Sequence, residues 1–173
     1  MSPFSSLLST DKKVARFREW FEILEYVVVS LAPIGYAPPA EDDVLLIPLL
    51  WMFEAGIQFP LHRLFQEFLA FLGLTLGQCS NNLVRIVMGM VSLNEITSSH
   101  LGVPDILHHY VLFRSPRGLW GLRQRPSRTT LLTNLPDTDQ GTYDDMISVI
   151  GRWEFAAGED QSFRVPRSEE QHV

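Results

Sequence analysis

The sequence is poor in cysteine: Cys79 is the only one, so no disulfide can form within the chain. A structural zinc site held by thiolates usually takes two or more cysteines, and strings of cysteine and histidine of the zinc-knuckle type are missing as well. A chain without disulfides is typical of a reducing compartment. We therefore expect an intracellular protein, with the nucleus and the cytoplasm both open, and no thiolate metal site.

Long apolar runs are also missing. The two most apolar stretches, residues 26–34 and 44–53, are well short of the ~20 residues that a membrane-spanning helix needs. Acidic residues 41–43 separate them. The N-terminus has neither the basic start nor the apolar centre of a signal peptide. We expect no membrane partner.

Positive charge is scarce, because 14 Lys and Arg residues face 20 Asp and Glu residues, which gives a net charge of −6. Such a chain has no whole-surface attraction for nucleic acid or anionic lipid, so any binding of this kind must be local. A length of 173 residues with 46% hydrophobic side chains suits one folded domain. We expect a flexible N-terminus over residues 1–12, a single domain over 13–155 and a polar tail over 156–173.

Motifs of phosphate-binding enzymes are missing, both the P-loop and the dinucleotide-binding glycine loop. Tyr143-Asp144-Asp145 resembles part of a polymerase motif, but Met146 stands where that motif places its second aspartate. No spacing among the acidic residues singles out a carboxylate triad. We predict that the chain is not an enzyme and has no catalytic residues, and we interpret Tyr143-Asp144-Asp145 as an acidic turn.

His100, His108 and His109, together with Cys79, are the remaining candidates for a metal site. Neighbouring residues on a helix point about 100° apart, so His108 and His109 cannot both face one ion without distortion. Cys79 has no glycine-rich elbow and no assignable base beside it, which favours a packed side chain over a nucleophile. We predict no metal and no cofactor.

The N-terminal third mixes one helical pattern with a loop. Apolar residues recur every three or four positions over residues 13–28, which predicts a helix with one buried face. Residues 32–43 concentrate proline, glycine and acids and are predicted to be a loop. Over residues 44–53 the pattern has no clean period, and Pro48 would break a helix interior. We interpret this stretch as an extended segment leading into a short helix near Pro48.

Three further helices are predicted from apolar stripes, capping residues and helix-breaking residues. The predicted spans are 61–72 with Pro60 in the first turn and a stop at Gly73, Asn81 or Asn82 to about Ile96, and Pro104 to about Phe113. Short links between them favour a compact helical unit.

Beyond Arg114 the helical pattern gives way to glycine, proline and β-branched residues. We predict short strands at 119–122, 130–133 and 146–155, the last broken near Gly151 and paired with one of the other two. The predicted fold class is therefore mainly α with a small C-terminal β element (α+β): a compact bundle of about four helices followed by two or three short strands.

Residues 114–128 form the only charge feature that indicates a function, because they hold five arginines and no acid lies between Asp105 and Asp137. Arginine contacts to phosphate and base stacking on a tryptophan would both be available there. A solvated basic hairpin, or pairing with acidic residues 41–43, are the alternative interpretations. The candidate nucleic-acid-binding residues are Arg114, Arg117, Trp120, Arg123, Arg125 and Arg128.

Residues 54–78 run as an aliphatic glycine segment, a Phe-Pro-Leu-His string, a helix and a Gly-Gln turn. This order resembles the central signature of the gypsy-type transposon family of plant genomes, and the resemblance extends over roughly residues 44–155. Val84 stands where that family usually has tryptophan, and residues 144–146 replace basic or aromatic types, as in a diverged copy. The signature residues are Gly56, Phe59, Pro60, Leu61, His62, Gly77 and Gln78.

The resemblance implies an origin more than an activity, because members of this family have no established enzymatic role. It implies a non-catalytic, transposon-derived structural or interaction domain that associates with itself or with another protein. An excess of aromatic side chains over the needs of a small core supports this hypothesis, namely Phe53, Phe59, Phe65, Phe68 and Phe71. The alternative hypothesis is a nucleic-acid-binding protein that uses residues 114–128.

Overall fold

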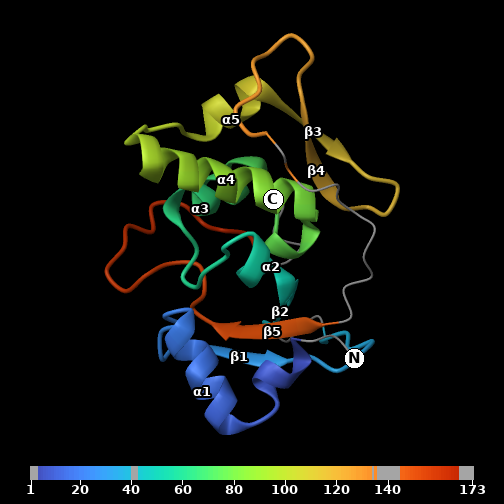
Figure 1. The fold of residues 1–173 in the computed structure, drawn as a ribbon, viewed down its shortest axis with the longest axis vertical. Helices are drawn as coiled ribbons and strands as arrows, with labels where there is room; N and C mark the ends of the chain where they lie inside the picture. Colours follow the sequence, from blue (N-terminus) through green and yellow to red (C-terminus); the bar gives the residue numbers. More distant parts are fainter. Residues whose placement is uncertain (1–3, 40–42, 134, 136–144, 168–173) are drawn as a thin grey trace.

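The computed structural model describes residues 4–39, 43–133, 135 and 145–167, which form five α-helices, five β-strands and two short 3-10 helices (Figure 1). A three-stranded sheet lies at one end of the molecule beside α1, and a two-stranded hairpin lies toward the other end, beyond α4 (Figure 1). The helices are α1 Asp11–Trp20, α2 Leu50–Glu54, α3 Arg63–Leu72, α4 Asn81–Thr97 and α5 Val103–His109. The strands are β1 Val27–Leu31, β2 Leu45–Pro48, β3 Tyr110–Arg114, β4 Trp120–Gln124 and β5 Met146–Gly151.

Helix α1 is shorter than its sequence pattern predicts. It begins where the Thr10 side chain accepts a hydrogen bond from the Lys13 amide, and it buries Phe17. The chain leaves helical geometry after Trp20 and reaches a positive φ of 49° at Glu22. The predicted helix over residues 13–28 is therefore wrong beyond Trp20.

Strand β1 replaces the end of that predicted helix. Its residues alternate between buried and exposed, which is the period of a strand. The Arg18 guanidinium donates a hydrogen bond of 2.7 Å to the Leu24 carbonyl and another to the Val27 carbonyl. Arg18 therefore occupies an outward-facing carbonyl that an edge strand would otherwise leave open.

Strand β5 is the central strand of the antiparallel sheet, whose order is β1-β5-β2. Val29 and Leu45 both face Val149 from opposite sides, and all three side chains are buried. The strand predicted over 146–155 is present as β5 only as far as Gly151, and the predicted pairing with residues 119–122 or 130–133 is wrong. Its partners come from the N-terminal third of the chain, a long-range pairing that no local pattern encodes.

The segment predicted as extended and then helical over residues 44–53 is present as β2 and α2. Pro48 ends β2 on a sheet edge, where a residue without an amide proton is tolerated. The Trp51 indole then donates a buried hydrogen bond of 2.5 Å to the Asn81 side chain. This bond joins α2 to the first turn of α4.

Helices α3 and α4 form the centre of the core. Helix α3 ends at Gly73 in the left-handed conformation, with φ of 65°, as predicted. Its first residue is Arg63, so Pro60 precedes the first turn instead of lying in it. Helix α4 is capped by Ser80, whose hydroxyl accepts a hydrogen bond from the Leu83 amide at 3.3 Å, and not by Asn81 or Asn82.

The predicted third helix is also shortened, because residues 110–114 form β3 and pair with β4. Together with β1 and β2, this strand overturns the predicted fold class. The chain is a mixed α+β protein with two antiparallel sheets, and not a bundle of about four helices followed by a few C-terminal strands. Short β-branched segments before and between the helices were the misread signal.

Most of the aromatic excess seen in the sequence is used in the core. Phe59, Phe65 and Phe68 are at most 1% exposed, and Phe53 packs against Phe17 with ring centroids 6.1 Å apart. Among the five residues of that group, Phe71 is the one with a largely exposed side chain, at 69%. No helix in the described part of the chain is long and apolar enough to cross a membrane.

Residues 156–167, assigned above to a polar tail, contact the fold. Val165 is buried with the core, and Arg63 lies 4.5 Å above the ring of Phe163. At the N-terminus, Phe4 stacks on Phe53 with ring centroids 5.0 Å apart. The described parts of both terminal segments therefore pack against the domain.

Gly151 closes β5 with φ of 103°, and a Cβ at this position would clash with the Tyr26 carbonyl oxygen. We predict that Gly151→Ala lowers the free energy of unfolding by about 3 kcal/mol, because it adds a steric clash to an unfavourable φ. Gly158→Ala is the matched control, since Gly158 also has positive φ, 78°, but no atom within 4 Å of an added Cβ. Urea denaturation measures both, and equal losses would contradict the clash at Gly151.

Candidate nucleic-acid interface

The basic stretch 114–128 folds as strand β4 with the turns on either side of it. The first turn joins β3 to β4 and is closed by a hydrogen bond of 2.9 Å from the Gly118 amide to the Ser115 carbonyl. Pro116 at the second position and Gly118 with φ of 83° are the residues that such a turn requires. Local sequence therefore fixes the hairpin tip, with Arg117 exposed on it.

The hairpin is attached to α4 along one edge. The Ser80 amide donates to the Trp120 carbonyl at 2.8 Å, and the Leu122 amide donates to the Asn82 side chain at 3.0 Å. Leu122 and Tyr110 turn inward and are buried. The hairpin is therefore held rigidly, with its tip directed away from the helices (Figure 1).

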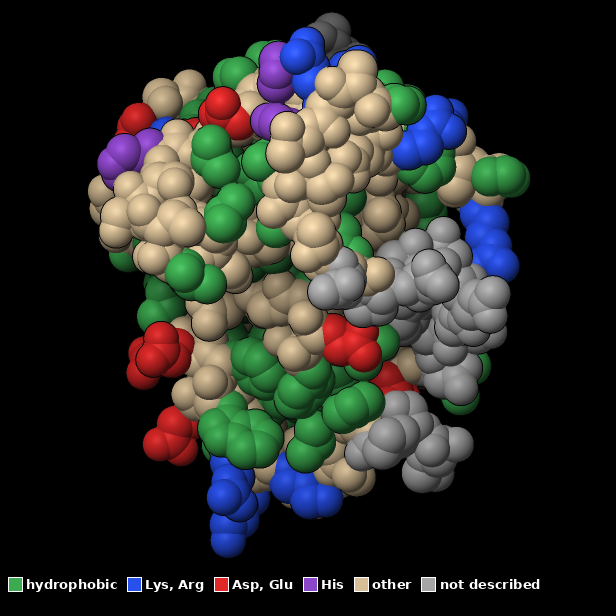
Figure 2. Space-filling view, turned by 45° about the horizontal axis from the view of Figure 1, so that its top comes forward, with side chains coloured by type: hydrophobic (Ala, Val, Ile, Leu, Met, Phe, Trp, Pro, Cys, Tyr) green, Lys and Arg blue, Asp and Glu red, His purple; other side chains and the backbone are tan. Residues whose placement is uncertain are grey.

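All five arginines predicted for this region are exposed. Over the described ranges, none has an Asp or Glu partner within ion-pair distance. Lys and Arg side chains gather on the upper right in Figure 2, the side on which Figure 1 places β3 and β4, and no acidic side chain lies among them there. The residues are Arg114, Arg117, Arg123, Arg125 and Arg128.

The two strand arginines lie over aromatic rings on opposite faces of the hairpin. Arg114 is 5.8 Å from the ring centre of Trp120, its cross-strand partner, and Arg123 is 5.5 Å from that of Phe113. These cation–π contacts hold the guanidinium groups in place and leave their charge uncompensated. Trp120 is only partly exposed and already contacts Arg114, so the geometry favours phosphate contact over base stacking at this tryptophan.

Arg125 and Arg128 flank a second turn, which follows β4. The Arg125 Nε donates to the Leu107 carbonyl at 3.2 Å, and its amide donates to the His109 carbonyl at 2.9 Å. The Arg128 amide donates to the Arg125 carbonyl and closes the turn. The Arg125 side chain therefore has a structural contact, whereas the side chains of Arg117 and Arg128 have none among the described residues.

The alternative interpretation is that these arginines pair with acidic residues 41–43. Asp43 is the residue of that acidic stretch that the structure describes, and its partner is a different arginine. Asp43 pairs with Arg167 at 2.8 Å. Residues 41 and 42 lie outside the described residues.

The transposon-like signature residues do not converge on one site. Gly56 has φ of 74°, Phe59 and Leu61 are buried, and Pro60 follows a cis peptide bond. The His62 ring accepts a hydrogen bond from the Leu64 amide at 3.2 Å, and the Gln78 side chain accepts one from the Thr75 amide at 2.9 Å. Gly77 is exposed in the short helix before Cys79. Each signature residue thus shapes a turn, a cap or the core.

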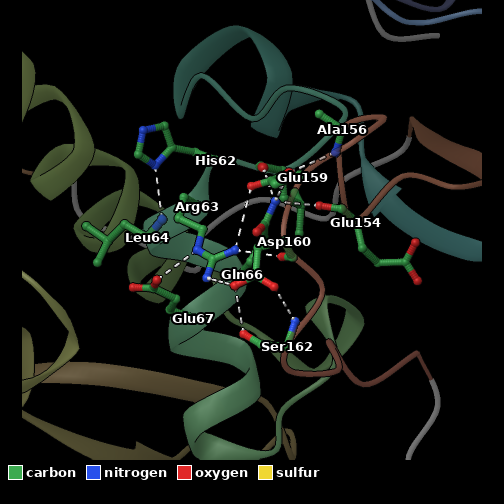
Figure 3. Close-up of polar contacts among 11 residues, drawn as sticks. His62, Arg63, Leu64, Gln66, Glu67, Glu154, Ala156, Glu159, Asp160 and Ser162 are labelled. Atoms are coloured by element: carbon green, nitrogen blue, oxygen red, sulfur yellow. Dashed lines mark hydrogen bonds and ion pairs between the residues drawn. The ribbon is translucent and has the colours of Figure 1, made fainter.

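A polar network missed by the sequence analysis joins the start of α3 to residues 154–162 (Figure 3). Gln66 is fully buried, and its Nε2 donates to the carbonyls of Leu61 and Glu154, both at 2.7 Å. The Glu159 carboxylate accepts from the same Nε2 at 3.2 Å and from the Ala156 amide at 2.8 Å. A glutamine within an apolar stripe was the available signal.

Arg63 extends this network on the surface. It bonds Glu67 at 2.8 Å and the Asp160 carbonyl at 2.9 Å (Figure 3). Its contacts are exposed by about a third or more, so each contributes little alone. The buried bonds of Gln66 are therefore the main tie between α3 and the C-terminal segment.

The remaining candidates for chemistry are separated or inert. The rings of His108 and His109 lie 5.1 Å apart at 79°, and His109 bonds the Thr129 carbonyl at 2.9 Å. Cys79 is buried, its thiol donates to the Thr75 carbonyl at 3.5 Å, and burial raises the pKa of the thiol, which disfavours the reactive thiolate. Among the described residues, no group of three His, Cys, Asp or Glu could hold a metal ion. Tyr143 and Asp144 of the predicted acidic turn lie outside these residues.

In the C-terminal segment, folding shifts the pKa of the Glu154 carboxyl. Burial raises the pKa of its carboxyl, and the neighbouring Asp43 raises it further, while its own backbone amide and Arg167 lower it. Arg167 lies 3.0 Å from the carboxylate and 5.2 Å from the Trp153 ring centre. The net effect is that the folded state holds the Glu154 proton more tightly than the unfolded state does.

Comparison of the chain with protein-family models, with curated proteins and with solved structures gave no match. The resemblance to the gypsy-type transposon family therefore stays a prediction that rests on the residues named above.

We predict a pH dependence of stability from Glu154. Its folded pKa lies above the ordinary value of 4.5, so between these two values the folded state binds more protons, and the free energy of unfolding falls as pH rises. Glu154→Gln removes this contribution. The stability of the variant relative to wild type should therefore rise with pH across that window in urea denaturation. Glu25→Gln, on the exposed segment before β1, is the charge-matched control, and a flat difference for Glu154→Gln would contradict the shift.

Proposed function

We propose that the chain is a non-catalytic binding module that contacts the phosphate backbone of nucleic acid through the β3–β4 hairpin and the turn that follows it. One observation carries the proposal: five exposed arginines without a carboxylate partner in the described ranges lie on a rigid hairpin and the turn after it, in an otherwise acidic protein. Elsewhere in the protein, Arg63, Arg85 and Arg167 each pair with a carboxylate. A cluster that does not is suited to an external anion.

The shape of the hairpin supports the same function. It is a two-stranded sheet of its own, each strand five residues or roughly 17 Å long, with arginines on both faces and at the tip. A two-stranded ribbon of this kind fits the major groove of duplex DNA, and the same arginines can follow a single strand. Contacts to phosphate fix position without reading the bases, so we propose binding with little sequence preference.

The net charge of −6 sets the expected behaviour. Long-range repulsion between the protein and nucleic acid lowers affinity at low ionic strength, whereas contacts at the hairpin release counterions and weaken as salt rises. We propose an intracellular setting for this activity. The transposon-derived origin implied by the signature residues is part of the same proposal.

The salt dependence of binding tests the proposal. Replacing Arg117 and Arg128 together by alanine should make the slope of log K against log salt less negative, by roughly 1.4 on a single strand and 1.8 on a duplex. The reason is that about two phosphate contacts are lost. Fluorescence polarisation with a labelled oligonucleotide across a salt series measures the slope. Neither side chain has a contact among the described residues, so the fold should not change.

Arg16→Ala is the control, since Arg16 is exposed on α1 at the opposite end of the molecule (Figure 1). It removes one positive charge, against two in the double variant, and should leave the slope unchanged. If the double variant and the control behave alike, the hairpin is not the binding surface.

A second candidate function is self-association through the outer face of the three-stranded sheet, in line with an interaction domain. Val28 and Ile150 face each other across β1 and β5 and are 52% and 44% exposed, and Tyr26 lies two residues before Val28. Trp20, at the end of α1, is 62% exposed. Hydrophobic side chains gather at the end of the molecule that carries α1 (Figure 2). A second copy of this face would remove them from water.

Light scattering coupled to size-exclusion chromatography tests this second candidate. Wild type should show a mass that rises toward a dimer with concentration, and Val28→Lys with Ile150→Lys should return it to the monomer. Phe71→Lys is the control, because Phe71 is an apolar side chain on α3 that is even more exposed, at 69%. A wild-type monomer at every concentration would rule out this face as a dimer interface.

A further inference from the structure

A cleft of about 820 Å³ opens between the end of β5 and the segment that follows it. Its walls are Tyr26 and residues from Gly151 to Arg167. The volume falls within the ~300–1,000 Å³ typical of small-molecule sites. The cleft lies outside the hairpin and shares no residue with it.

The walls of the cleft are fixed by hydrogen bonds and an ion pair. The Arg167 guanidinium donates to the Gly151 carbonyl at 2.8 Å and pairs with Glu154 at 3.0 Å, so it joins the two ends of the segment. The Ala157 amide donates to the Tyr26 hydroxyl at 3.2 Å. The buried bonds of Gln66 hold the same segment against α3. A cleft built this way is largely preformed.

The charge of the cleft is positive. Arg167 is engaged by Glu154 and Asp43, but Arg152 and Arg164 also line the cleft, and both are exposed. Neither has a carboxylate partner over the ranges that the structure describes. Two guanidinium groups at one opening favour a ligand with an anionic group, and phosphate suits their planar, paired donors.

The cleft also presents aromatic side chains. Tyr26, Phe155 and Phe163 line it, and the rings of Phe155 and Phe163 lie 5.6 Å apart. Aromatic surfaces of this kind bind the face of a flat ring in a ligand. A flat ring is rigid and therefore loses little conformational entropy when it binds. A ligand that uses both kinds of lining residue therefore combines a phosphate with a flat ring.

We propose that this cleft binds a nucleoside phosphate, with Arg152 and Arg164 on the phosphate and with Tyr26, Phe155 and Phe163 around the base. The proposal rests on the cleft alone and is independent of nucleic-acid binding by the hairpin. It assigns no reaction, because the catalytic groups such a reaction requires are not identified around the cleft.

Calorimetric titration of the full chain with ADP tests the site. One ADP should bind per chain, while inorganic phosphate and adenosine, which carry the two halves of its chemistry, should each bind at least about tenfold more weakly. Arg152→Gln and Arg164→Gln should each weaken ADP binding about tenfold, since each removes a charge-assisted contact. Both side chains are exposed, so the variants should fold, and circular dichroism is the measurement that checks this.

Arg117→Gln on the hairpin is the matched control and should leave ADP affinity unchanged within about twofold. The cleft variants in turn should leave the salt slope of oligonucleotide binding unchanged, which separates the two sites. Absence of heat with ADP up to millimolar concentration overturns the proposal. Equal affinity for inorganic phosphate overturns the nucleoside class, and loss of ADP binding in Arg117→Gln alone moves the anion to the hairpin.

Discussion

The pairing of β5 between β1 and β2 is the constraint on which the rest of the structure depends. It brings the C-terminal part of the chain onto the N-terminal part, with Ile147 and Val149 buried between Val29, Leu45 and Ile47. With β5 in place, the segment after it lies against α3, where Gln66 and Arg63 donate hydrogen bonds to its carbonyls. Arg167 then closes that segment back on Gly151 and forms part of the wall of the cleft.

The molecule separates its two charged surfaces by this architecture. The hairpin is tied to α4, whereas the cleft lies between Tyr26, the end of β5 and the segment that follows β5. In the hairpin, the arginines lie over aromatic rings and remain free of acids among the described residues. In the cleft, Glu154 and Asp43 engage Arg167 and leave Arg152 and Arg164 for a ligand. An acidic protein can thus keep local positive sites without a basic overall charge.

Local features of the fold could be predicted from the sequence, and the long-range pairing of strands could not. Gly73 stops α3 because it reaches the left-handed conformation, and the Ser-Pro-Arg-Gly string fixes the hairpin tip, both within a few residues. The arginine cluster was predictable for the same reason. The partners of β5, by contrast, depend on burial against segments far away in the sequence, and the sequence offered nearer candidates. The cleft was missed because Tyr26 and Arg164 meet only after that pairing forms.

The strands of this sheet are synthesised far apart in time. Strands β1 and β2 leave the ribosome early, but their common partner ends at Gly151, 120 residues after the end of β1 at Leu31 (151 − 31). At ~5–20 residues per second, the two strands wait on the order of ten seconds before β5 is made. During that interval their apolar faces have no partner in the sheet, and Arg18 and Pro48 are the only edge-blocking features described for them. The three-stranded sheet therefore closes only after most of the chain has been made.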